Sequence, residues 1–373
     1  MRIAVFCHSL LSDWNHGNAH FLRGLVTELI ARGHQVRVYE PVDAWSYVNL
    51  IGEKGDEPVE AFGKVYPMLD PVRYHLQTFD PAAELDEPDL ILVHEWNDPA
   101  LVARLGRYRA ARRDCRLLFH DTHHRSITQP EAMAKYDLSA CDGVLAFGQV
   151  IRDTYLQRGW ARRAWVFHEA ADVRVFRPLA GRPKVGELVW VGNWGDEERA
   201  AELHRFLLGP IVALKLTSTL FGVRYTDDAL AALKAGGIRY GGWVANFRVP
   251  EQFARHRVTV HIPRRPYAEA LPGIPTIRPF EAMACGIPLI CSPWEDREGL
   301  FTAGSDYLVA RDGDEMKAHL RAVLSDAALA RSLAEHGRRT ILGRHTCGHR
   351  AGQLMEICGE LGLRAGSQRE AEA

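Results

Sequence analysis

Short apolar runs alternate with polar loops and amphipathic stretches along the first half of the chain. An apolar run at residues 2–7 leads into a polar loop at 11–18, and apolar residues then recur at helical spacing from Leu22 to Ile30. Gly33 ends that predicted helix, and a second apolar run follows at 35–39. Strand, helix and strand in this order predict a parallel sheet. Further strands are expected at 90–93, 116–119, 143–147 and 164–167, whereas residues 41–88 give no clear order.

A break in this pattern separates two similar halves. Residues 174–186 contain two prolines and two glycines with little periodicity, which indicates a linker. A second set of strands is expected at 188–192, 213–222, 237–243, 258–262, 287–291 and 307–309, and an amphipathic helix follows from Met316 to Leu324. The sequence therefore predicts an α/β protein with two Rossmann-like, doubly wound parallel-sheet domains. The first domain is expected over 1–173 and the second over 187–345. Residues 346–373 are expected to form a C-terminal helix and a frayed tail, which covers 365–373. In one alternative the helix returns to the first domain.

Composition narrows the class of protein. The chain has 373 residues, of which 47% are hydrophobic and 25% charged, as is ordinary for a soluble globular protein. The net charge of −1 argues against general nucleic-acid binding, which usually needs a basic excess. No apolar run approaches the ~20 residues of a transmembrane helix. Seven cysteines without a CxxC spacing favour reduced thiols. These features together predict a cytoplasmic protein.

The stretch from Pro272 to Pro293 is the strongest candidate for a site. It is expected to form a rigid loop, a short helix with Pro279 at its first position, a stop at Gly286 and a buried strand. Glu281 is then expected in the first helical turn, where the helix dipole favours a carboxylate. Because free backbone amides at a helix start bind anions, phosphate is the expected ligand.

Four segments carry a resemblance to a known family: 281–290 (EAMACGIPLI), 171–178 (ADVRVFRP), 16–38 and 238–263. In this order they resemble the nucleotide-sugar-dependent glycosyltransferases of the GT-B fold. The resemblance is to the retaining, family 4-like group (glycosyl transferases group 1), and within it to the CgeB-like branch. It implies that the two domains face a cleft, with the nucleotide sugar in the second domain and an unidentified acceptor in the first. The acceptor would be a carbohydrate, a lipid-linked molecule or a small molecule, and the reaction would be retaining, with no metal or cofactor.

The resemblance also implies roles for donor-side residues. Glu281 would accept hydrogen bonds from the ribose hydroxyls. Gly273 stands where the family usually has a glutamate that contacts the donor sugar, so that contact departs from the pattern. The diphosphate would bind to backbone amides of the loop before the helix, to arginine side chains and to the turn after the first strand of the second domain, and the nucleobase would stack on a tryptophan. The candidates, in that order, are Gly273, Ile274, Thr276 and Ile277; Arg264, Arg265 and Arg278; Gly192 and Asn193; and Trp243. A surface role for each arginine and a core role for Trp243 are the alternatives.

Candidates in the first domain follow the predicted strand at 116–119. A histidine after this strand suits proton transfer or polarisation of a leaving group, so His120, and behind it His123, are the catalytic candidates. A metal site is not expected there, because consecutive loop positions rarely converge on one ion. Gly17 and Asn18 would let the first loop approach the phosphates or the acceptor, and Asn18 as a plain N-cap is the alternative. Trp45 and Trp96 are candidates for stacking on an acceptor sugar.

Three alternatives remain open. The arginines between Arg104 and Arg116 form either a solvated face or a peripheral membrane contact for an anionic or lipid-linked acceptor. A nucleotide-sugar epimerase on the same fold would need acid and base carboxylates around the sugar, and no such pair is evident. A non-catalytic nucleotide-sugar-binding subunit is favoured by the glycine at 273.

Overall fold

The computed structural model describes residues 1–363, so the predicted frayed tail lies outside the described part of the chain. The chain divides into two compact units. Unit 1 is Met1–Glu169 together with the chain from Cys347 onward, and unit 2 is Ala170–Thr346. The predicted linker, 174–186, lies within the residues of unit 2.

Unit 1 contains a seven-stranded sheet in the order β3-β2-β1-β4-β5-β6-β7, in which every neighbouring pair is parallel. β4 is buried at every position, as expected of a central parallel strand with helices on both faces. The strands are β1 (Arg2–Phe6), β2 (Gln35–Pro41), β3 (Val72–Tyr74), β4 (Leu90–His94), β5 (Arg116–Asp121), β6 (Gly143–Ala146) and β7 (Ala164–Val166).

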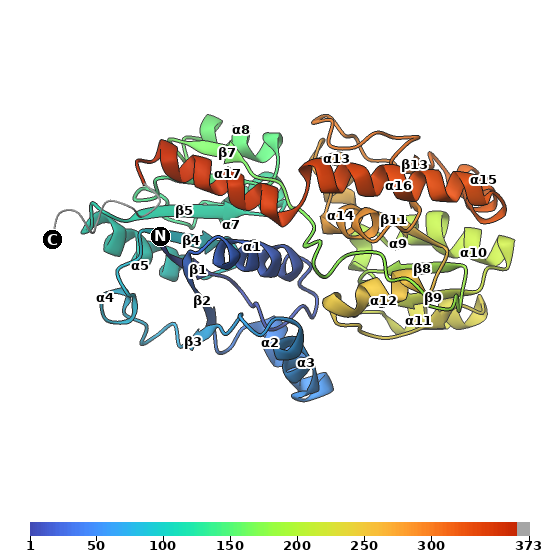
Figure 1. The fold of residues 1–373 in the computed structure, drawn as a ribbon, viewed down its shortest axis with the longest axis horizontal. Helices are drawn as coiled ribbons and strands as arrows, with labels where there is room; N and C mark the ends of the chain where they lie inside the picture. Colours follow the sequence, from blue (N-terminus) through green and yellow to red (C-terminus); the bar gives the residue numbers. More distant parts are fainter. Residues whose placement is uncertain (364–373) are drawn as a thin grey trace. The chain divides into compact units, whose positions relative to one another are not determined.

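The helices of unit 1 follow the strands in the predicted βα alternation. α5 illustrates the local cause, because Asp98 caps it by accepting a 2.7 Å hydrogen bond from the Ala100 amide and Pro99 occupies its first turn. The helices are α1 (Ala19–Ala31), α2 (Trp45–Lys54), α3 (Glu57–Val65), α4 (Pro81–Glu84), α5 (Pro99–Ala110), α6 (Arg125–Thr128), α7 (Pro130–Met133), α8 (Gln149–Gln157) and α17 (Cys347–Glu360). The α2–α3 pair projects from the rest of unit 1 (Figure 1).

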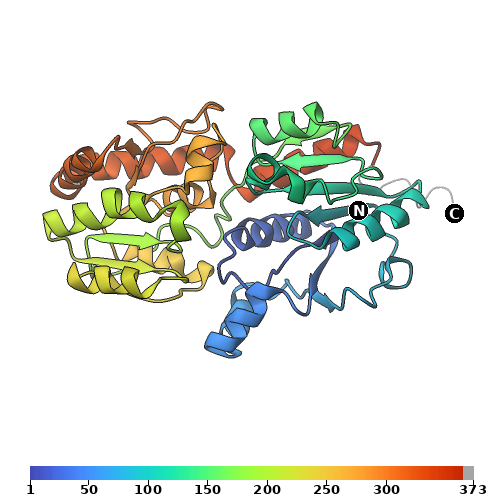
Figure 2. The same ribbon diagram turned by 180° about the vertical axis from the view of Figure 1, so that it is seen from behind.

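α17 follows unit 2 in sequence but packs on unit 1. It lies in front of the unit 1 sheet in Figure 1 and behind it in Figure 2. Arg32 donates to the Gly348 carbonyl at 2.6 Å, and Trp165 donates to the Glu360 carboxylate at 2.9 Å. Bonds at both ends of the helix therefore fix it to α1 and β7.

Unit 2 repeats the architecture with a six-stranded parallel sheet in the order β10-β9-β8-β11-β12-β13. Its core packs around Trp190 and Val260. The strands are β8 (Leu188–Val191), β9 (Ser218–Phe221), β10 (Arg239–Tyr240), β11 (Val258–His261), β12 (Leu289–Cys291) and β13 (Leu308–Val309). The helices are η1 (Asp196–Glu198), α9 (Ala200–Leu203), η2 (His204–Leu208), α10 (Gly209–Leu214), α11 (Asp227–Ala235), η3 (Asn246–Arg248), α12 (Val249–Ala254), α13 (Arg265–Glu269), α14 (Ile277–Ala284), α15 (Gly313–Ser325) and α16 (Ala327–Arg344).

α14 starts two residues earlier than the sequence predicts. It begins at Ile277, so Pro279 is its third residue and Glu281 its fifth, and its first turn contains no acidic residue. Proline is tolerated there because the first amides of a helix have no intrahelical acceptor. The predicted place of Glu281 in the first turn is therefore wrong. Gly286 has the expected left-handed backbone, with φ +65°.

Candidate functional site

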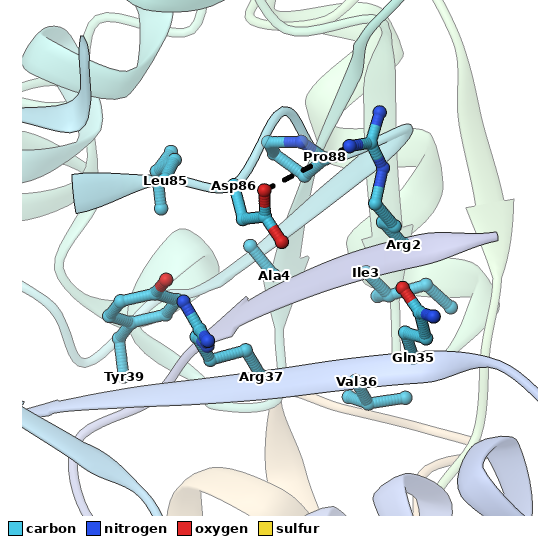
Figure 3. Close-up of a pocket in the computed structure, with 10 residues that line it drawn as sticks. All are labelled: Arg2, Ile3, Ala4, Gln35, Val36, Arg37, Tyr39, Leu85, Asp86 and Pro88. Carbon is cyan, nitrogen blue, oxygen red and sulfur yellow. Dashed lines mark ion pairs between the residues drawn. The ribbon is translucent and has the colours of Figure 1, made fainter. Parts of the chain in front are cut away.

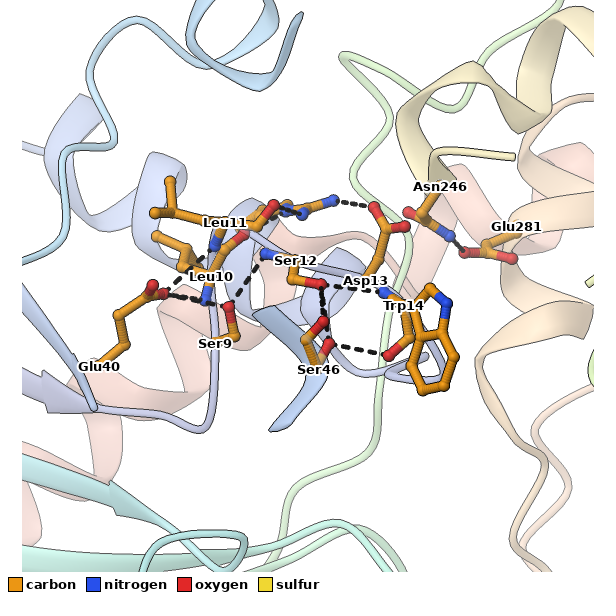
Figure 4. A network of polar contacts seen from close by, with 11 residues as sticks. Ser9, Leu10, Leu11, Ser12, Asp13, Trp14, Glu40, Ser46, Asn246 and Glu281 are labelled. Carbon is orange, nitrogen blue, oxygen red and sulfur yellow. Dashed lines mark hydrogen bonds and ion pairs between the residues drawn. The ribbon is translucent and has the colours of Figure 1, made fainter. Parts of the chain in front are cut away.

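Glu281 is fully buried on α14 and both of its carboxylate oxygens are held. The Asn246 amide donates to Oε1 at 2.7 Å, as Figure 4 shows, and the Arg278 guanidinium donates to Oε2. Asn246 comes from η3, which follows β10, so two separate elements fix the carboxylate. The Glu281 carboxylate is therefore held in a fixed orientation by side chains of unit 2.

Arg199 is a buried cation that the sequence analysis missed. It is 9% exposed, its guanidinium lies 5.1 Å from the Trp190 ring centre, and it donates to the carbonyls of Ile262 and Asn193. Burial, followed by repulsion from Arg264 and Arg278, lowers the pKa of Arg199 to about 9. Arg199, Arg264 and Arg278 thus lie close enough to act on one another near the carboxyl edge of β8 and β11, where Glu198 and Glu281 pair with the last two.

The other two predicted basic candidates differ in their surroundings. Arg264 lies 3.4 Å from Glu198 and is about a quarter exposed. Arg265 pairs with Glu202 at 3.1 Å and is nearly half exposed. Burial, together with Arg199 and Arg278, lowers the pKa of His261 to about 3, so this histidine adds no charge to the arginine cluster at neutral pH.

The loop before α14 uses two of its amides within the protein. The Gly273 amide donates to the Glu295 carbonyl at 2.6 Å, and the Ile274 amide donates to the Leu271 carbonyl at 3.1 Å. Gly273 has φ +92°, and a β-carbon there would lie 2.8 Å from Cγ of Glu298. The Glu298 side chain therefore fills the space beside Gly273. Thr276 and Ile277 stand at the start of α14, where backbone amides have no intrahelical acceptor.

Gly192 and Asn193 follow β8, and hydrogen bonds link them to residues that follow β9. The Asn193 side chain accepts a 3.0 Å hydrogen bond from the Val223 amide, and Tyr225 donates to the Gly192 carbonyl at 3.2 Å. This contact closes the carboxyl ends of β8 and β9 against each other.

Trp243 is half-buried and lies three residues before Asn246. Its indole N–H is buried and meets no acceptor within the described part of the chain. The β10–η3 loop therefore carries both an aromatic ring and the side chain that orients Glu281.

Four imidazoles form a row at the carboxyl edge of the unit 1 sheet. Ring centres are 5.4 Å apart for His8 and His16, 6.4 Å for His16 and His94, and 5.4 Å for His94 and His120. Burial lowers the pKa of His8 to about 4 and that of His120 to about 3, and it lowers the pKa values of His16 and His94 as well. All four are neutral at physiological pH.

The two histidines predicted to be catalytic lie in different surroundings. His120 is fully buried between Phe21 and Phe167, with ring centres 5.9 and 5.5 Å away. His123 is half-buried and its ring meets Trp96 edge-on at 4.9 Å. Of the two, His123 is the one that a substrate can reach without rearrangement.

The loop after β1 is fixed by its own unit. Glu40 at the end of β2 accepts hydrogen bonds from the Leu10 amide at 2.6 Å and the Leu11 amide at 3.3 Å (Figure 4). Arg23 donates to the carbonyls of the same two residues and to Asp13. A carboxylate at this strand end binds ribose in dinucleotide-binding folds. Here it is occupied by the loop itself.

Asn18 does not cap α1 with its side chain. It occupies the N-cap position, but its side chain donates to the Thr122 hydroxyl, which also contacts Nε2 of His94 at 2.8 Å. Asn18 is thus the N-cap residue by position, as the alternative expects, but without a side-chain capping bond. Asn18 ties the start of α1 to the ends of β4 and β5, while Gly17 is exposed.

The arginine run of α5 is largely engaged in packing. Arg104 donates to two carbonyls of residues 76–79, Arg109 pairs with Asp142 at 2.7 Å, and Arg116 donates to the Leu361 carbonyl at 2.9 Å. Arg112 lies within 3.4 Å of Glu87. Four of the six arginines therefore hold unit 1 together, which leaves Arg107 and Arg113 as the exposed cations of the run.

Metal sites, membrane-spanning helices and cavities are the other features that bear on function. Within residues 1–363 no group of three or more His, Cys, Asp or Glu side chains is arranged to hold a metal ion, and no helix is long and apolar enough to cross a membrane. A cavity of about 270 Å³ lies beside the first residues of β1 and β2 and the loop Leu85–Pro88 (Figure 3). This is the amino end of the strands, whereas ligands of such sheets bind at the carboxyl end.

Comparisons with known proteins agree with this geometry. Residues 199–356 match a family model described as glycosyl transferase-like, and no curated protein matches the chain. Sucrose-phosphate synthase from Thermosynechococcus elongatus aligns over 97% of this chain and 99% of its own, with 15% identity and a TM-score of 0.64. Anabaena HepE in complex with UDP and glucose aligns over 96% and 100%, with 15% identity and a TM-score of 0.64.

A third similar structure is an alpha-glucosyltransferase in complex with UDP and a 13-mer DNA. It aligns over 96% of this chain and 99% of its own, with 12% identity and a TM-score of 0.68. At these identities the likeness concerns the fold. The predicted fold class is confirmed: the chain has the two-domain architecture of the GT-B glycosyltransferases, with a glycosyl transferase-like segment that begins at the buried Arg199.

Proposed function

We propose that the protein is a glycosyltransferase that moves a sugar from a nucleoside diphosphate sugar to an acceptor. The observation that carries this proposal is Arg199, a buried guanidinium beside Arg264 and Arg278 at the carboxyl edge of the unit 2 sheet. Burying a cation is unfavourable unless an anion compensates it. A diphosphate supplies that anion.

Glu281 completes the donor site in this proposal. Its carboxylate is oriented by Asn246 and Arg278, and a carboxylate suits the ribose hydroxyls because it can accept hydrogen bonds from two donors at once. The arginines would stabilise the negative charge that develops on the departing diphosphate. Trp243 would stack on the nucleobase.

Unit 1 would hold the acceptor. His123 is the candidate for proton transfer, because His120 stays neutral to about pH 3 and is fully buried. Asn18 and Gly17 would shape the loop that the acceptor meets.

The finer assignments belong to the same proposal. UDP is the first nucleotide to test, since it is present in the HepE and alpha-glucosyltransferase complexes. From the resemblance we also propose that arginines, and no metal ion, bind the diphosphate and that the reaction retains the anomeric configuration. The same resemblance suggests that the protein belongs to the CgeB-like branch of the family 4-like group. The anomeric proton coupling of the product decides the stereochemistry. A cytoplasmic location fits the seven free thiols.

The test is nucleotide binding by thermal shift. UDP, GDP, ADP and dTDP are added to the protein, and at least one is expected to raise the melting temperature. Arg199→Gln and Glu281→Ala should each weaken that nucleotide about ten- to a hundredfold, because each removes hydrogen bonds to or from a charged group. Arg311→Gln is the control, since Arg311 is largely exposed and pairs with Glu315. If no nucleotide shifts the wild-type protein, the proposal is wrong.

A further inference from the structure

The carboxyl edge of the unit 1 sheet combines tryptophan with imidazole. Trp45 follows β2, is 37% exposed, and lies 4.7 Å from His8 and 6.1 Å from Trp14, measured between ring centres. His16 continues the row toward β4. Trp45 thus provides the accessible surface above a row of buried rings.

His8, which lies next to Trp45, is uncharged in this geometry, and the nearby Asp43 carboxylate only partly offsets the effect of burial on the pKa of His8. Nε2 of His8 accepts a 3.3 Å hydrogen bond from the Ser46 amide, which requires the nitrogen to be unprotonated. Burial lowers the pKa values of all four clustered histidines, and neighbouring imidazoles add to this effect at His16 and His94. The row therefore contributes no positive charge toward a ligand.

The arginines that contact this edge are each engaged by the protein. Arg23 is fully buried and pairs with Asp13 at 2.8 Å. Arg73 lies 3.6 Å from Glu40 and stacks on Tyr47. Arg125 pairs with Glu95 and lies over Trp96. A phosphate or carboxylate group at this edge would have to compete with these carboxylates, whereas Arg199 of unit 2 donates to backbone carbonyls.

We propose that unit 1 binds a neutral carbohydrate acceptor at this edge, with Trp45 as its stacking surface. The apolar face of a sugar ring packs on an indole, and a hydroxyl group, which both donates and accepts, matches a neutral imidazole such as His16, whose Nε2 has no partner among the described residues. Sugar phosphates, phospholipid-linked sugars and nucleic acid are disfavoured, because each would bring an anion to a surface whose arginines already have carboxylate partners. This inference rests on the proposed function, in which unit 1 is the acceptor unit.

The experiment compares two matched probes on the full chain with UDP present. Methyl α-glucoside and glucose 6-phosphate share the ring and differ in charge, and their binding is measured by saturation-transfer NMR with titration. The glucoside is expected to bind more tightly than the phosphate. Trp45→Ala should weaken the glucoside about five- to tenfold, as expected for loss of one stacking contact, whereas Trp45→Phe keeps most of the affinity.

Val48→Ala is the matched control, because Val48 lies on the same helix, is 53% exposed, and has no part in the proposed site. Tighter binding of glucose 6-phosphate, binding of neither probe, or unchanged glucoside binding in Trp45→Ala would each overturn the inference. None of these results affects the UDP melting shift, so failure of the inference is separable from failure of the donor proposal.

Discussion

Gly222 lies where two backbone segments meet at the carboxyl ends of β8 and β9. Its φ is +153°, and a β-carbon at this position would lie 2.0 Å from the Gly192 carbonyl oxygen. That oxygen belongs to the turn that Asn193 ties to Val223. The close approach therefore shapes the part of unit 2 in which the diphosphate is proposed to bind.

Gly222→Ala should destabilise the protein by about 2–3 kcal/mol or more, because the backbone must separate to admit the methyl group. Gly237 also has a positive φ, of +65°, but a β-carbon there meets nothing within 4 Å. Gly237→Ala should cost only about 1–2 kcal/mol, the penalty of the left-handed conformation itself. Denaturant unfolding of the two variants tests this difference, and equal losses would refute the steric explanation.

At the level of single residues, the sequence identifies Glu281 as a candidate but misses Arg199 and Asn246. Arg199 follows three acidic positions, 196–198, which is typical of an exposed helix start. Its burial depends on Trp190 and on the Ile262 carbonyl, which belong to β8 and to the residue after β11. Such contacts join distant parts of the chain, so local sequence patterns do not reveal them.

Among the elements of unit 1, the β1–α1 loop depends on one arginine of α1. Arg23 is fully buried and bonds Asp13 and the carbonyls of Leu10 and Leu11. Phe62 of α3 lies 4.9 Å from the guanidinium. Arg23 therefore holds the loop and the projecting helix pair to the same point.

Arg23→Met should destabilise unit 1 by about 3–5 kcal/mol, since it leaves the Asp13 carboxylate without its buried partner. Asp13→Asn added to Arg23→Met should recover part of the loss, because the stranded charge is then removed. Unfolding followed by tryptophan fluorescence measures both variants. If the double variant is no more stable than Arg23→Met alone, charge pairing is not the reason for the loss.

Helices and strands can be predicted from the sequence where the residues that cause them lie close together in the chain. Central strands and α5 are readable because continuous apolar runs and a cap-plus-proline start lie within a few residues. Residues 41–88 give no clear order because they contain a three-residue strand and two short helices that project from the rest of unit 1. α14 begins two residues before its expected start because Pro279 fits anywhere in the first turn.

At the scale of the whole molecule, buried histidines control the response to acid. Five of them, in both sheets, have folded pKa values well below the ordinary value of 6.5: His8, His16, His94, His120 and His261. Below pH 6.5 these histidines bind protons in the unfolded chain but not in the folded protein. Stability is therefore lost as the pH falls below about 6.5 toward the lowered folded pKa values.

Unfolding free energy should fall as the pH is lowered from 7.5 to 5.5, and the slope should steepen below pH 6.5 toward at most about 1.4 kcal/mol per pH unit for each such histidine. Glu95 opposes this trend: burial outweighs its Arg125 partner and raises its pKa to about 8, so its protonation favours the folded state as the pH falls. Burial also raises the pKa values of Glu40 and Asp121, and these three carboxylates reduce the loss of stability without cancelling five histidines. Denaturation curves at pH 7.5, 6.5 and 5.5 provide the measurement.

His120→Phe should make this pH dependence shallower by about the share of one histidine, because phenylalanine suits the pocket between Phe21 and Phe167 and does not titrate. An unchanged slope would show that His120 already takes up its proton as readily in the folded protein as in the unfolded chain.

α17 belongs to unit 1 although 177 residues of unit 2 precede it. A ribosome adds about 5–20 residues per second. The first sheet is therefore made early but waits about 10–40 seconds for the helix that bonds α1 and β7. Unit 2 is contiguous and has no such delay, so the later-made sheet can mature before the earlier one. During that interval the surface that α17 will cover is open to chaperones.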